Sequence, residues 1–150
     1  MSEALNSKAL QEKIDRVEEI LELSVPIVKI LEGLVLVPII GTLDSDRTQH
    51  IMENLLEKIM RENADVAILD ITGVPTVDSK TAQHLIDTVS AVRLLGSKVI
   101  ITGIRPTIAQ TLVHLGIVLS DIMTARSLAL GVKLALELLN LTLIDTNHPE

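Results

Sequence analysis

At 150 residues and 16.3 kDa, the chain is long enough for one domain with a sizeable core, and its lack of cysteine excludes disulfides and thiolate chemistry. A net charge of −7 and the absence of Phe, Tyr and Trp argue against nucleic acid as a partner, because basic surfaces and stacking side chains are missing. No apolar run approaches the roughly 20 residues that cross a bilayer, and the acidic N-terminus has no signal-peptide pattern, so we expect a cytoplasmic protein without membrane partners.

The first predicted element is an amphipathic helix over residues 4–23. Leu10, Ile14, Val17 and Leu21 are spaced by four, three and four residues, which is the heptad seam of a short coiled coil. The same spacing is equally typical of a helix that packs on its own domain, because about two heptads are too few to identify a coiled coil. Both alternatives, a linker or dimerisation helix and a packed helix, therefore stay open.

A β-hairpin and a helix are predicted next. The apolar runs Val25–Leu31 and Leu34–Ile40 are separated by Glu32-Gly33, which is typical of a two-residue hairpin turn. The loop Gly41–Ser45 ends in residues that favour a helix N-cap, Asp44 among them. An amphipathic helix is expected to follow this loop.

The central stretch of the chain is a strand, a turn and the start of a helix. Val66–Ile71 is short, apolar and rich in branched residues, which predicts a buried strand. Gly73 and Pro75 are expected to end it, and Asp78 and Ser79 precede a segment of helical spacing. A serine hydroxyl is thus expected just beyond the carboxyl end of a central strand, where function usually lies in open α/β sheets.

Helices and strands then continue to alternate. The predicted elements are a helix that ends at Gly96, a strand over Lys98–Thr102, a short helix between Pro106 and Gly116, a strand within Ile117–Met123 and a helix capped by Ser127. The alternation predicts an α/β fold with a mixed, mostly parallel sheet of four to five strands. The loops Gly41–Ser45, Thr72–Ser79 and Gly103–Thr107 are expected to meet at one end of this sheet.

Ser79 is the main candidate for chemistry. A serine at such a position is most often the N-cap of its helix. It lacks the G-x-S-x-G context of a hydrolytic nucleophile, and no histidine is placed as its base. A phosphate there makes better sense, because it adds about −1.5 to −2 charges at a favourable helix N-terminus. Beside Asp78 and near Asp70, that charge is expected to give the surface two distinct states.

The other polar candidates carry weaker signals. Asp70 and Asp78 allow the alternative of a small enzyme or nucleotide-binding domain that uses them with Mg²⁺ or as acid and base, although Asp78 favours a cap. Thr107 and Thr111 are typical of a solvated helix edge, and Arg105 either steers an anion or is solvated. No histidine spacing fits a metal site and no phosphate-binding glycine motif occurs, so neither metal nor cofactor is expected.

Three motifs resemble those of STAS domains, the anti-sigma-factor-antagonist fold. Residues 41–44, Gly-Thr-Leu-Asp, are similar to the Gly-x-Leu-Asp signature, and residues 70–79 resemble the phosphorylation loop. Residues 103–111 closely resemble the matching stretch of RsbR-type stressosome proteins. The resemblance covers about residues 25–139. It implies a STAS domain over residues 25–140 and an N-terminal linker or dimerisation helix over residues 1–24. The residues after this domain, 141–150, are predicted to be a polar tail.

The resemblance also implies a function: a non-catalytic scaffold that captures and releases an RsbT-type switch serine/threonine kinase in stress signalling. Ser79 matches the phosphoacceptor position and Thr111 the second phosphorylated threonine of the RsbR type, whereas a serine at position 79 is also what RsbS-type scaffolds carry. The residues implied to contact partners are Asp44, Thr76, Asp78, Arg105 and Thr107.

The implied partners are the kinase and RsbR- or RsbS-type paralogues, in a homodimer or a large oligomer. The N-terminal helix resembles the linker to a sensor, and no sensor domain precedes Ala4, so the chain is expected to be a fragment or a short paralogue. A simple antagonist that binds an anti-sigma factor one to one is the nearest alternative.

Overall fold

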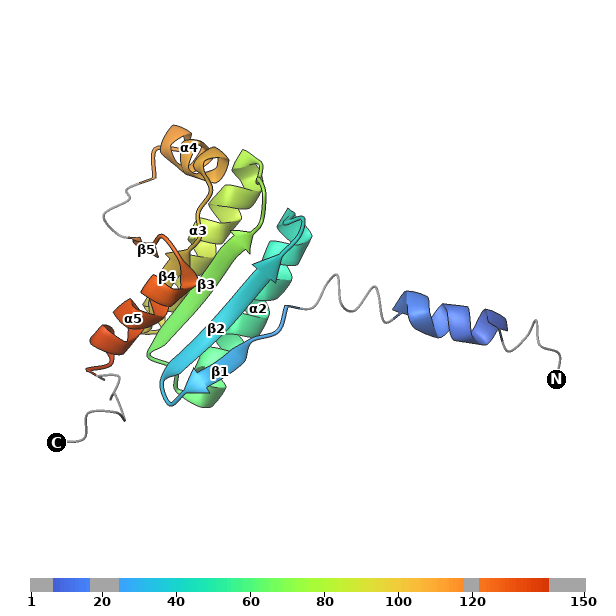
Figure 1. Ribbon diagram of the computed structural model, residues 1–150, viewed down its shortest axis with the longest axis horizontal. Helices are drawn as coiled ribbons and strands as arrows, with labels where there is room; N and C mark the ends of the chain where they lie inside the picture. The colour runs from blue at the N-terminus through green and yellow to red at the C-terminus, as the bar shows by residue number, and fades with distance from the viewer. Residues whose placement is uncertain (1–6, 17–24, 118–121, 141–150) are drawn as a thin grey trace.

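The computed structural model describes residues 7–16, 25–117 and 122–140. Residues 7–16 are helical, and the elements after them are β1 (Val28–Leu31), β2 (Leu34–Ile40), α2 (Ser45–Glu62), β3 (Val66–Gly73), α3 (Ser79–Leu94), β4 (Lys98–Thr102), α4 (Pro106–His114), β5 (Met123–Ala125) and α5 (Leu128–Leu138). The strands form one sheet in the order β1-β2-β3-β4-β5, in which β1 is antiparallel to β2 and all other neighbours are parallel. The predicted α/β fold with a mixed, mostly parallel sheet is confirmed (Figure 1).

Different helices cover the two faces of the sheet, because side chains alternate between the faces along each strand. On β3, Ala67, Leu69 and Ile71 belong to the larger core cluster, which α2 and α3 complete. Val66 and Ile68 point the other way, into a smaller cluster completed by α5. Figure 1 shows α2 and α3 behind the sheet and α5 in front of it. β3 is therefore buried on both faces, which explains its nearly continuous apolar sequence.

Local signals in the sequence correctly predicted how the helices begin and end. Asp44, Asp78 and Ser127 are the N-caps of α2, α3 and α5, and each side chain accepts a backbone N–H of the first turn. Pro106 is the first residue of α4, where a missing N–H costs nothing. Gly96 follows α3 with φ +90°, in the left-handed region that suits a glycine after a helix.

The first strand is shorter than predicted. β1 begins at Val28 instead of Val25, and its first pair in the ladder joins Val28 to Leu36 of β2. Pro26 has no N–H to donate, so it cannot extend the pairing with β2. Val25 is nevertheless buried, as part of the larger core cluster. The segment before β1 thus contributes to packing without joining the sheet.

The third strand is longer than predicted, and the last lies later in the chain. β3 continues through Gly73, where the Gly41 N–H donates to the Gly73 carbonyl at 3.0 Å. A Cβ on Gly73 would lie 3.3 Å from the Ile39 carbonyl oxygen, so Gly73 permits close pairing with β2 and is also, as predicted, the residue at which β3 ends. β5 comprises Met123–Ala125, and residues 118–121 of the predicted strand lie outside the described residues.

The N-terminal helix is described only over residues 7–16, which is half of the predicted span. Leu10 and Ile14 of the predicted seam are 59% and 40% exposed, so this part of the seam is not buried within the chain. Val17 and Leu21 lie outside the described residues, as does the predicted polar tail over residues 141–150. In the described ranges, no helix combines the length and the hydropathy needed to cross a bilayer.

Candidate functional site

The carboxyl ends of β2, β3 and β4 bring together three loops that are far apart in the sequence. The first loop comprises residues 41–45, the second residues 72–79 and the third residues 103–107. The hydrogen bond from Gly41 to Gly73 joins the first loop to the second. Arg105, in the third loop, donates from Nε and Nη2 to the Thr72 carbonyl at 3.1 and 2.9 Å. The predicted meeting of the three loops at one end of the sheet is therefore confirmed, and α4 lies over this end (Figure 1).

The loop over residues 72–78 is anchored by two valines. Val74 and Val77 are only 0% and 7% exposed and belong to the larger core cluster. The Val74 N–H also donates to the Ile71 carbonyl at 3.0 Å, which closes a tight turn at the end of β3. Thr76, between the two anchors, is exposed. Burying both valines holds the loop down and leaves the polar residues between and after them facing solvent.

Asp78, and not Ser79, caps α3. The Asp78 carboxylate accepts the Thr81 N–H at 2.7 Å, and the extended backbone of Asp78 is that of an N-cap. The prediction of a cap at Asp78 is therefore confirmed, and that of a cap at Ser79 is wrong, because the neighbouring carboxylate takes that role. Ser79 is instead the first helical residue, and its side chain is exposed. Its hydroxyl is therefore accessible at the surface and is not needed to satisfy the helix end.

The Asp78 cap also makes the stability of the fold depend on pH. The hydrogen bond from the Thr81 backbone N–H, followed by that from the Thr81 hydroxyl, lowers the pKa of Asp78 below its ordinary value of 3.8. A lowered folded-state pKa means that the ionised carboxylate stabilises the fold above pH 3.8 and that this stabilisation is lost as pH falls through the folded-state pKa.

We expect Asp78→Asn, which keeps a capping oxygen but removes the charge, to unfold more easily than the parent chain at about pH 7. The difference should shrink towards about pH 3, because the parent carboxyl becomes neutral as well. Urea unfolding of the two full chains at several pH values measures this difference. A gap that stays constant across the pH range would contradict the assignment of the charge to the cap.

Asp44 plays the same part for α2. Its carboxylate accepts the Arg47 N–H at 2.8 Å, and its backbone carbonyl accepts the Thr48 N–H and hydroxyl. Arg47 folds back so that Nη1 donates to the Thr42 carbonyl at 2.8 Å. Asp44 is exposed, and one of its carboxylate oxygens is engaged in the cap. The Gly-x-Leu-Asp motif thus has a local structural reason, in which Leu43 is buried and Asp44 begins a helix.

The start of α4 contacts the loop that ends at Ser79. Besides the two donations from Arg105, the Thr107 hydroxyl donates to the Pro75 carbonyl at 3.0 Å. Thr111, one turn later and half-buried, donates from its hydroxyl to the Thr107 carbonyl at 3.1 Å. Arg105 and Thr107 were predicted to contact a partner or to be solvated. Arg105 Nε and Nη2 and the Thr107 hydroxyl donate within the chain, to the carbonyls of the neighbouring loop.

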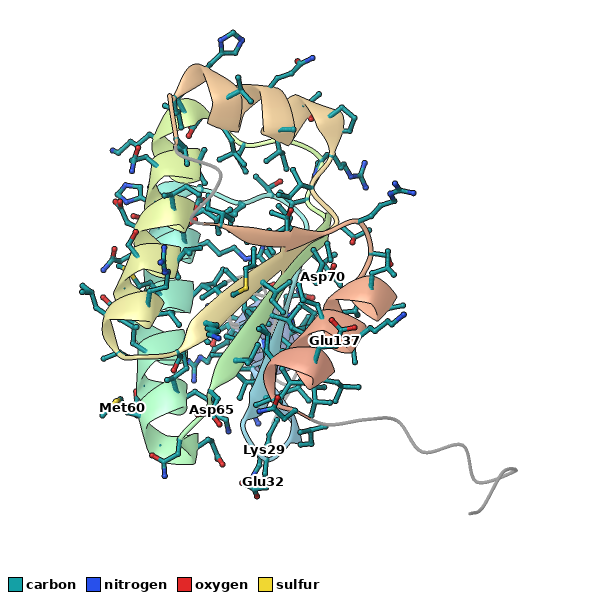
Figure 2. All side chains as sticks on the ribbon, turned by 90° about the vertical axis from the view of Figure 1, so that its left-hand side faces the viewer. Lys29, Glu32, Met60, Asp65, Asp70 and Glu137 are labelled. Atoms are coloured by element: carbon teal, nitrogen blue, oxygen red, sulfur yellow. The ribbon has the colours of Figure 1, made fainter. Side chains whose placement is uncertain are left out.

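A carboxylate network lies beneath these loops, and sequence reasoning missed it. Asp70 Oδ1 accepts the hydroxyls of Thr72 and Thr102 at 2.8 and 2.7 Å. Asp70 and Thr102 are direct partners in the parallel ladder of β3 and β4, so the register places them side by side. Figure 2 shows Asp70 at the far end of the sheet from Lys29 and Glu32, which mark the β1–β2 turn. Only the strand register, which the sequence does not state, brings this network together.

Gly103 is a second residue that sequence reasoning did not single out. It has φ +75°, and a Cβ at this position would overlap the Thr72 hydroxyl oxygen and lie 2.8 Å from Thr72 Cα. The backbones of the second and third loops therefore touch at this point, and only glycine fits. The available signal was the position of a glycine directly after a predicted strand, which commonly marks a close approach of two backbones.

The alternative of a metal-dependent enzyme gains no support from these contacts. Asp70 bonds two hydroxyls and Asp78 caps α3, so each carboxylate has a structural role. Within the part of the chain that the structure describes, no three His, Asp or Glu side chains gather as a metal site would require. What the arrangement does offer is an exposed hydroxyl at a helix start, on a loop whose shape is held from two sides.

Comparison with known proteins agrees with the motif resemblance. The model of the STAS domain matches residues 25–130. The RsbT co-antagonist protein RsbRA of Bacillus subtilis (strain 168) is 46% identical over 117 residues, which cover 78% of this chain and 43% of RsbRA. This chain therefore spans less than half of that relative.

Two solved structures match over nearly their whole length. A variant of RsbS from Moorella thermoacetica, in which one serine is replaced by glutamate, has a TM-score of 0.68 and 31% identity over 78% of this chain and 98% of its own. A chain from the stressosome, described as a signal integration and transduction hub, has a TM-score of 0.64 and 28% identity over 77% of this chain and 100% of its own.

Proposed function

The chain belongs to the STAS domain family, and on that premise we propose that it is a cytoplasmic, phosphorylation-controlled scaffold without catalysis of its own. In this proposal it captures an RsbT-type switch kinase and releases it when Ser79 is phosphorylated. The observation that carries the proposal is the accessible Ser79 hydroxyl at the first position of α3, on a loop pinned by two buried valines. The similarity to RsbRA, which is described as an RsbT co-antagonist protein, supports the choice of kinase.

The same proposal assigns the remaining site residues. Asp44, Thr76 and Asp78 are exposed around Ser79 or at the adjoining loop, and we propose that they contact the kinase. Thr111 is the second phosphoacceptor. The scaffold assembles with RsbR- or RsbS-type paralogues into an oligomer, and the similarity to a stressosome chain supports this part of the proposal.

The test is phosphorylation by a purified RsbT-type kinase with ATP, followed by mapping of the modified residue by mass spectrometry. We expect the parent chain to be phosphorylated at Ser79 and Ser79→Ala to lose that modification. Size-exclusion chromatography with an RsbS-type paralogue should give a large multi-subunit particle. Phosphorylation elsewhere with Ser79 unmodified would contradict the proposal, and a one-to-one complex with an anti-sigma factor would favour the simple antagonist.

A further inference from the structure

Arg105, the N-cap of α4, and Thr107 in its first turn hold the loop that presents Ser79. Three hydrogen bonds cross from the third loop to the second: two from Arg105 to the Thr72 carbonyl and one from Thr107 to the Pro75 carbonyl. Both acceptors are backbone atoms, so the contacts fix the path of the loop and not merely a side chain. Pro75 lies four residues before Ser79, and Val77 is buried between them.

Thr107 links this contact to a second hydroxyl. Its hydroxyl has a single proton, which it donates to Pro75, and its backbone carbonyl accepts the Thr111 hydroxyl at 3.1 Å. Residues four apart on a helix lie on the same face, about 5–6 Å apart at Cβ. The two hydrogen bonds form a chain of two links from α4 into the loop, joined through the residue Thr107, whose carbonyl makes one link and whose hydroxyl makes the other.

Phosphorylation of Thr111 would change both links of that chain. The kinase transfers the γ-phosphoryl group of ATP to Thr111 Oγ1, ADP leaves, and the hydroxyl proton is released. Thr111 then has no proton to donate to the Thr107 carbonyl. Its phosphate brings three acceptor oxygens to the helix face that carries the Thr107 hydroxyl, and a charged acceptor makes a stronger hydrogen bond than a neutral carbonyl.

We propose that Arg105 and Thr107 are positioning residues for the Ser79 loop, and that phosphorylation of Thr111 draws the Thr107 hydroxyl away from Pro75 and loosens that loop. The two phosphoacceptors then form one coupled switch instead of two independent sites. A loosened loop is less preorganised for docking, so phosphorylation of Thr111 lowers the capture of the kinase at Ser79. This inference rests on the proposed function for its biological meaning, whereas the change in the loop can be measured without any kinase.

The decisive experiment measures amide hydrogen exchange of residues 72–78 by NMR in the full chain, with threonine or genetically encoded phosphothreonine at position 111. Three backgrounds are compared: the parent chain, Thr107→Val and Thr107→Ser. Valine keeps the shape of the threonine side chain but loses the hydroxyl, whereas serine keeps the hydroxyl. Since one hydrogen bond is at stake, we expect Thr107→Val to speed exchange of the loop about threefold to tenfold. Phosphothreonine at position 111 should speed exchange of the loop by a similar factor in the parent and in Thr107→Ser. In Thr107→Val it should cause no further increase in the exchange rate.

An equal effect of phosphothreonine in the parent and in Thr107→Val would overturn the inference, as would unchanged exchange in Thr107→Val. Steady-state phosphorylation of Ser79 provides the second readout: the same changes should raise KM about threefold to tenfold and leave kcat unchanged. If no RsbT-type kinase modifies Ser79 in the parent, the proposed function fails, while the exchange data still decide whether Thr107 couples Thr111 to the loop.

Discussion

Ser79→Asp is expected to weaken capture of the RsbT-type kinase by roughly tenfold to a hundredfold in Kd, because like charges brought together in an interface cost several kcal/mol. The added carboxylate would stand beside Asp78, whose lowered pKa keeps it ionised near neutral pH. A docked kinase would then meet two neighbouring negative charges where the parent chain presents one. Isothermal titration calorimetry with the purified kinase measures the change.

The same substitution should not harm the fold. The first turn of α3 contains no acidic residue, and a negative charge there is favourable to the helix macrodipole. A loss of binding by Ser79→Asp therefore reports on the interface and not on unfolding, which thermal denaturation can verify.

Three further variants test whether the loss of binding requires a negative charge and whether that charge must be at position 79. Ser79→Ala and Ser79→Asn, which are uncharged, should bind the kinase nearly as well as the parent chain. Ser90→Asp adds the same charge on the same helix at another exposed position, and it should bind the kinase normally. Equal affinities for Ser79→Asp and Ser79→Asn would exclude a charge-operated switch at this position.

Gly103→Ala should destabilise the domain by about 3 kcal/mol or more, because two costs add. A non-glycine residue at φ +75° is strained, and the new Cβ would collide with Thr72 at both the hydroxyl oxygen and Cα. The clash with Cα cannot be relieved by a side-chain rotation, so the second loop itself must move. Urea unfolding of the full chain gives the free energy of unfolding.

Gly96→Ala is the matched control for this prediction. Gly96 has φ +90°, and nothing lies within 4 Å of a Cβ built there. It should therefore cost only the strain of the left-handed backbone, about 1 kcal/mol. If both variants lost the same free energy of unfolding, the close contact between Gly103 and Thr72 would not account for the effect of Gly103→Ala. Gly103→Ala should also weaken capture of the kinase, because the displaced loop leads to Ser79.

The sequence by itself determined the order of the elements and most of their ends. Asp78, Pro106 and Gly96 act on their own helix through capping, a fixed φ and a left-handed backbone, so neighbours a few residues away suffice to predict them. The short, continuous apolar run of Val66–Ile71 also predicted that β3 is buried. The motifs around Ser79 and Thr111 went further and indicated the family, because they combine turn residues and hydroxyls in one recognisable order.

Only the tertiary structure decided what the polar side chains of the site do. Arg105 could have been solvated or bound to an anion, and its use on the Thr72 carbonyl depends on a contact across 33 residues. Asp70 and Thr102 meet because β3 and β4 pair in one parallel register, which their own sequences leave open. Local signals set dihedral angles and helix ends, whereas the partners of a hydrogen bond between loops are set by how the strands between them pack.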